Sequence, residues 1–121
     1  MNPRIDSVVM KPNQQQATVS GPINWESDDL SATFSAVIAQ MEPSTGAIVL
    51  ATGENLHPYT PADSRWQVDV QTVGGDKLTK GNAEGWGIGS EVNNNGRECY
   101  PWQVPDLTIE EQPVVVTAPP H

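Results

Sequence analysis

The sequence predicts an all-β domain, a sandwich of about seven strands, and three observations lead to this prediction. Small or apolar residues alternate with polar ones in several separate runs, which is the pattern of half-buried strands. Turn residues interrupt these runs at spacings of about ten residues, as in sandwiches and unlike βαβ units. The 121 residues include ten glycines and eleven prolines, more than a helical protein carries.

The first two strands are expected over residues 5–10 and 17–25. From Ala17 to Trp25 every second residue is small or apolar and those between are mostly polar. Pro22 indicates an edge or a bulge here, because proline offers no amide hydrogen to a neighbouring strand.

Residues 30–41 fit either a strand or a helix when taken alone. Alternate residues from Leu30 to Ile38 are apolar, but the apolar positions up to Met41 also fit a helical spacing. Asp28 and Asp29 would suit a helix N-terminus. A proline- and glycine-containing turn and a second β-rich run at 47–51 follow directly, so we favour a hairpin of two strands.

The remaining strands are expected at 66–70, 81–90 and 99–109. The segment 81–90 is unusual, because its alternate positions Gly81, Ala83, Gly85, Gly87 and Gly89 leave one face of the strand nearly bare. Such a face admits a close-packed aromatic ring or a neighbouring backbone, and it could also receive another subunit. An Asn-Gly pair then predicts a tight hairpin into the last strand, which Pro101 and Pro105 confine to an edge or a kink.

We divide the chain into a sandwich at 1–110 and an extended C-terminal arm at 111–121. In the arm, prolines bracket the run Val114, Val115 and Val116. Prolines lower the entropy lost when a segment becomes ordered. The three valines are therefore candidate partner-binding residues that would pair with the edge strand of a neighbouring chain.

Several segments carry a resemblance to a known family. They are Ala17-Thr18-Val19-Ser20-Gly21 leading to Trp25, Ala51-Thr52-Gly53, Trp66 to Val70, Leu78-Thr79-Lys80-Gly81 with Ala83, and Trp102 with Val104. This pattern of strands and turns resembles that of bacterial and phage immunoglobulin-like or fibronectin-III-like domains over about residues 5–110. It departs from antibody-type domains in lacking paired cysteines. The resemblance implies an Ig-like antiparallel sandwich and a passive role in adhesion, spacing or decoration, and it implies no chemistry.

Composition excludes several classes of function. Fifteen acidic residues against six basic ones give a net charge of −9, so we expect no nucleic-acid partner. No apolar run is long enough for a membrane helix, and the N-terminus does not resemble a signal peptide. The single cysteine, Cys99, leaves no intrachain disulfide or CxxC zinc site. We expect a protein made in the cytoplasm, located in a virion; the alternative is a cytoplasmic protein, or an extracellular one exported without a signal.

No catalytic constellation is apparent, so we expect no enzyme and no cofactor. The run Gly85-Trp86-Gly87-Ile88-Gly89 lacks the spacing and the following helix of a phosphate-binding loop. The loop Glu26-Ser27-Asp28-Asp29 could supply calcium ligands, but it lacks the DxDxDG pattern, and acidic loops are commonly just solvated. We therefore predict no metal site.

The aromatic residues complete the functional prediction. Trp25 and Trp66 are expected in the core, whereas Tyr100 and Trp102 flank a proline on the last strand and are candidate partner-binding residues. We predict a non-catalytic structural subunit that docks on a protein assembly or on copies of itself, most specifically a phage or virus capsid decoration protein. The alternative is a carbohydrate-binding or adhesion module, which requires Tyr100 and Trp102 to form an exposed platform.

Overall fold

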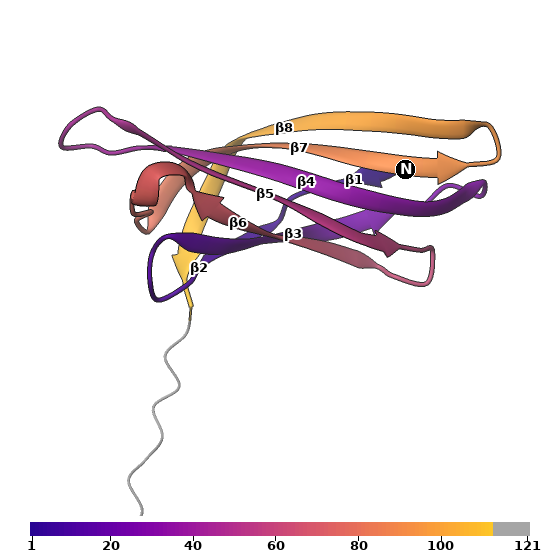
Figure 1. Cartoon of the computed structure of the whole chain (residues 1–121), viewed down its shortest axis with the longest axis horizontal. Coiled ribbons are helices and arrows are strands. Elements are labelled where there is room, and N and C mark those ends of the chain that lie inside the picture. The colour runs from indigo at the N-terminus through magenta and orange to yellow at the C-terminus, as the bar shows by residue number, and fades with distance from the viewer. Residues whose placement is uncertain (113–121) are drawn as a thin grey trace, which may run out of the picture.

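The chain folds into a closed β-barrel (Figure 1). The computed structural model describes residues 1–112. The strands are β1 (Asn2–Pro3), β2 (Ser7–Met10), β3 (Gln16–Asn24), β4 (Asp29–Met41), β5 (Ile48–Tyr59), β6 (Arg65–Thr72), β7 (Gly81–Asn93) and β8 (Gly96–Glu111). A single 3₁₀ turn at Val73–Gly75 is the only helical element within this part of the chain. No helix in residues 1–112 has the length and apolar character needed to cross a membrane.

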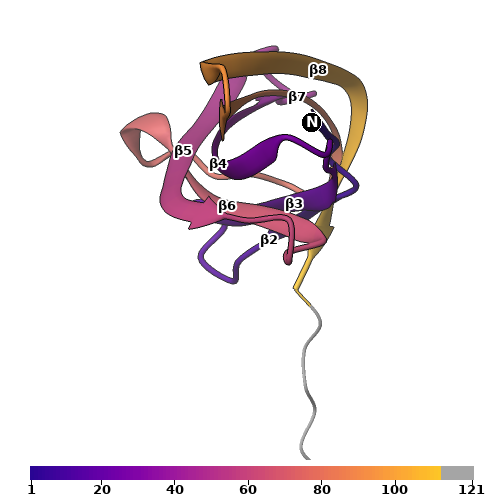
Figure 2. The same ribbon diagram turned by 90° about the vertical axis from the view of Figure 1, so that its right-hand side faces the viewer.

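Seven strands form the barrel wall in the order β2-β8-β7-β4-β5-β6-β3, and β3 returns to β2. The β2–β8 pair is parallel and all other pairs are antiparallel. The ring closes at β3, where Ala17 lies opposite Met10 of β2 on one side and opposite Val70 of β6 on the other. Figure 2 shows this ring of strands from one end of the barrel.

The all-β prediction is therefore confirmed, but the Ig-like sandwich is wrong, because the strands close into one barrel. Alternation of apolar and polar residues gives each strand one buried face in both architectures, so it cannot distinguish them. The difference lies in pairing at the sheet edges. At Gly53, for example, a Cβ atom would collide with the Asp69 carbonyl, so β5 meets β6 at a position that admits only glycine.

The predicted strands are all present, including the disputed segment at 30–41, which is the strand β4. One residue of that strand departs from the prediction. A register shift between Asp29 and Ser31 turns Leu30 outward, where it is 52% exposed, while Ala32 and Phe34 beyond the bulge face the core as expected. The last strand was predicted to lie at an edge or to kink at its prolines. Pro105 does fall at an irregularity, a register shift between β7 and β8.

Three aromatic rings from three strands fill the barrel. Phe34 of β4 stacks on Trp66 of β6 with centroids 5.1 Å apart, and Trp102 of β8 meets Trp66 edge-on at 5.5 Å. The Trp66 indole donates a hydrogen bond to the Arg4 carbonyl, so its polar atom is satisfied inside the core. The core position predicted for Trp66 is confirmed.

The bare face of β7 points into this core. A Cβ atom at Gly85 would collide with the Leu107 side chain, and one at Gly87 would overlap the indole ring of Trp102. Gly89 lies in the same way against Met1 and Phe34. The expectation that this face admits a close-packed aromatic ring is confirmed. It is buried, so it is not the surface on which another subunit could lie.

The last strand ends by joining the first part of the chain. Ile109, Glu110 and Glu111 pair in parallel with Val8–Met10, so the barrel wall is complete at Glu111. Residues 113–121, with the candidate residues Val114, Val115 and Val116, lie outside the described part of the chain.

The packing of Trp102 on Gly87 yields a stability prediction. Gly87→Ala should lower the free energy of unfolding by about 1–3 kcal/mol, because the added methyl group overpacks the core. In a Trp102→Leu background the same change should be nearly neutral or stabilising, since alanine suits a strand better than glycine once the ring is gone. Urea unfolding of the four proteins measures this coupling. An equal cost in both backgrounds would contradict the packing.

Candidate functional site

The barrel carries a cluster of apolar side chains on the outside of β4, β5 and β7. We call it the outer patch, and it consists of Val37, Met41, Ile48, Leu50, Trp86 and Ile88. Met41, Ile48, Leu50 and Ile88 are between 42% and 63% exposed. Single exposed apolar residues are ordinary, whereas a contiguous apolar patch on adjacent strands is a feature typical of interaction sites.

Strand register brings these residues together. Val37 of β4 lies opposite Trp86 of β7, and Met41 lies opposite Ile48 across the β4–β5 hairpin. Residues opposite one another in an antiparallel sheet project from the same face. The inward glycines of β7 also force this arrangement, because the alternate residues Trp86 and Ile88 must then point outward.

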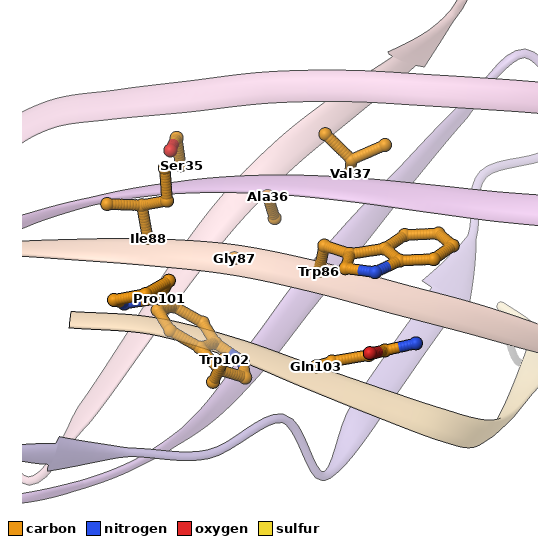
Figure 3. A pocket seen from close by; sticks show the side chains of 9 residues that line it. All are labelled: Ser35, Ala36, Val37, Trp86, Gly87, Ile88, Pro101, Trp102 and Gln103. Atoms are coloured by element: carbon orange, nitrogen blue, oxygen red, sulfur yellow. The ribbon is translucent and has the colours of Figure 1, made fainter.

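Two depressions flank Trp86. The first has a volume of about 440 Å³ and is shown in Figure 3, where Trp86 and Ile88 stand on either side of Gly87. Its lining is Ser35, Ala36, Val37, Trp86, Gly87, Ile88, Pro101, Trp102 and Gln103. The second, of about 450 Å³, includes Met41, Ile48, Leu50 and Pro105 and shares Trp86 with the first. Trp86 is therefore the centre of the outer patch.

The charged neighbours of the outer patch are mainly acidic. Glu84, two residues before Trp86 on the outer face of β7, lines the second depression. Glu42 and Asp76 line a neighbouring groove beside Ile48, together with Lys77. With a net charge of −9 on the whole chain, this surface suits an apolar partner whose margin is neutral or basic.

The two candidate residues on β8 occupy less exposed positions than an open platform requires. Both are half-buried and pack against the core, Tyr100 opposite Gly89 and Trp102 opposite Gly87. Tyr100 donates a hydrogen bond of 2.6 Å to Glu98, which raises the pKa of the phenol. Trp102 contributes to the lining of the first depression.

Trp86 is the residue that the sequence analysis missed. The sequence analysis assigns Trp86 no position or role, although Trp86 and the glycines have opposite parity along the strand. If the bare face is the one that packs inside, Trp86 must lie outside. That parity was the signal that could have identified it.

A second unusual feature is a cluster of charges around the N-terminal amine. It consists of Met1, Glu26, Asp29 and Glu91, and we call it the acidic mouth. The Met1 ammonium nitrogen lies 3.3 Å from Glu26 Oε1, 3.5 Å from Asp29 Oδ2 and 3.6 Å from Glu91 Oε2. Asp29 and Glu91 are buried, with exposures of 4% and 1%. Buried carboxylates are costly unless they are paired, so this cluster needs its cation.

The pKa values of Asp29 and Glu91 are shifted in opposite directions. Burial raises the pKa of Glu91, and its hydrogen bond with Asp29 raises it further. Burial also works against the charged form of Asp29, but hydrogen bonds from Glu91 and from the Glu26 amide lower the pKa of Asp29 on balance. The two carboxyl groups therefore behave as a pair.

Comparison with known proteins finds no match to a family model, to a curated protein or to a solved structure. The candidate function is accordingly inferred from the outer patch itself.

Proposed function

We propose that this protein is a non-catalytic structural subunit that docks on a larger protein assembly through the outer patch. The observation that carries the proposal is the position of Trp86 between two largely apolar depressions on a chain with a net charge of −9. Tryptophan is enriched among the residues that dominate binding energy at protein interfaces, and such residues sit at the centre of an interface.

The rigidity of the strands that carry the outer patch favours this function. The outer patch lies on β4, β5 and β7, three paired strands whose opposite faces pack in the barrel core. A surface held in this way loses little conformational entropy on binding, so more of the contact energy remains for affinity.

The proposal includes the specific setting expected from the sequence, decoration of a virion. The acidic surface supports it, because like charges keep neighbouring copies apart on a crowded particle. The carbohydrate alternative depended on an exposed Tyr100 and Trp102 platform. Both side chains pack against the core, so no specific observation favours that alternative.

Photo-cross-linking from the outer patch tests the docking surface. A photoreactive amino acid in place of Leu50, in the full chain expressed in its native source, should give one discrete product with an assembly protein. In that background, Trp86→Ala should weaken association by about 2 kcal/mol or more, about thirtyfold, and remove the product. The measurement is the mass and yield of cross-linked species.

The matched control places the same photoreactive group at Gln71, an exposed position on β6. It should give no discrete product. Equal products from Leu50 and Gln71, or a product that survives Trp86→Ala, would count against the outer patch as the docking surface.

Truncation after Gln112 tests the contribution of Val114, Val115 and Val116. The barrel wall is complete at Glu111, so the melting temperature should change by less than about 2 °C. If the arm engages a neighbouring chain, higher-order association of the full chain should be lost in the truncated one. Light scattering after size exclusion reports both masses, and unchanged association would remove the three valines from the proposed interface.

A further inference from the structure

The two depressions beside Trp86 follow one another along the same pair of strands, and we call them together the outer groove. The first depression begins at Ser35 of β4 and Ile88 of β7, and the second extends to Met41 and Asn82 on those strands. Trp86 lines both. The six residues from Ser35 to Met41 correspond to about 20 Å of extended strand. The outer groove therefore matches the length of about six residues of an extended peptide.

The chain itself contains a segment whose chemistry suits the outer groove. Residues 112–121, Gln-Pro-Val-Val-Val-Thr-Ala-Pro-Pro-His, include no Asp, Glu, Lys or Arg. An uncharged segment is not repelled by Glu84 at the margin of the groove, and its valines and prolines offer apolar surface. Proline-rich segments bind in grooves lined by aromatic side chains, because they lose little conformational entropy on binding. Trp86 and Trp102 supply such side chains here.

Charge favours this segment over a direct contact between two barrels. Each copy has a net charge of −9, so two barrels placed face to face repel one another. An uncharged segment connects two copies while their charged surfaces stay apart. Exposed charges separated by more than about 8 Å are largely screened at physiological ionic strength.

The course of β8 keeps the valines of a chain away from Trp86 of the same chain. Gln103 lies opposite Trp86, and β8 then continues to Glu111, which pairs with Met10 of β2. Figure 2 shows this last part of β8 curving round the barrel to β2, away from β5. The path from Gln103 to Glu111 is about 26 Å of strand, and it is longer on the outside of the curve. Val116 reaches at most about 18 Å back along this path from Glu111, so it falls short of Trp86.

We propose that the outer groove binds residues 113–119 of a second copy of this chain. This inference rests on the proposed docking role of the outer patch, and it identifies the assembly protein that meets the patch as another copy. The groove and the bound segment are different surfaces of the chain, so the contact is head-to-tail and can repeat from copy to copy. Neighbouring subunits of an assembly would be linked in this way.

Cross-linking between two isotopically distinct copies tests the contact. Purified full chain with a photoreactive amino acid at Leu50, which lines the second depression, is mixed with an equal amount of full chain labelled with heavy nitrogen. Illumination should give a two-chain product in which light residue 50 is joined to a heavy peptide from residues 112–121. Mass spectrometry identifies the joined peptides. The same group at Gln71, an exposed position on β6, should give no such product.

Substitutions in each partner separate a specific contact from chance collision. Val115→Asp in the heavy chain brings a charge to the apolar groove and should lower the yield by about tenfold or more. The matched control Val115→Ile keeps the apolar character and should leave the yield within about twofold. Trp86→Ala in the light chain should remove the product. The barrel wall is complete at Glu111, so substitutions at Val115 should leave the melting temperature unchanged.

Three results would overturn the inference: no product with the heavy segment, a product confined to one chain, or a yield that Val115→Asp leaves unchanged. Cross-linking from Leu50 in the native source then judges the proposed function separately. A discrete product with a different protein, removed by Trp86→Ala, would show that the outer patch docks elsewhere and that only this inference is wrong. If neither experiment gives a discrete product, the docking role of the outer patch fails as well.

Discussion

The contact between the glycine face of β7 and the Trp102 indole is the constraint on which the rest of the structure depends. Because Gly87 has no side chain, the ring can lie directly against the backbone of the neighbouring strand and reach Trp66 and Phe34 across the barrel. The same contact fixes the orientation of β7. Its glycines are inside, so Trp86 and Ile88 are outside, and the core and the outer patch are two results of one strand orientation.

The sequence predicted the strands well and their assembly poorly, for a physical reason. Alternation is a local property, so Ala17, Trp66 and the residues after Leu30 could be placed on buried faces correctly. Closure depends on pairing between segments distant in the chain, such as the parallel β2–β8 ladder at Val9 and Glu110, and no local pattern encodes it. Leu30 was misplaced because a bulge shifts the parity of a strand without any mark in its composition.

The candidate sites show the same division. The loop carboxylate of Asp29 could be recognised from the sequence, but Glu91 reaches it only through the pairing of β4 with β7. The outer patch likewise takes Leu50 and Trp86 from strands that meet only through β4. The two surfaces have different characters, one apolar and rigid, the other acidic and close to the chain terminus. We assign docking to the first, whereas the charges of the second are paired within the chain by the Met1 ammonium.

The orientation of β7 is the central claim, and nuclear magnetic resonance tests it most directly. With Gly87 against the indole face of Trp102, the Gly87 Hα protons should show nuclear Overhauser effects to the Trp102 ring protons and a marked ring-current displacement of their chemical shifts. The Trp86 ring should instead show contacts with Val37 and exchange its indole proton readily with solvent. Gly87 Hα protons at ordinary shifts, together with a protected Trp86 indole, would contradict the structure and the outer patch with it.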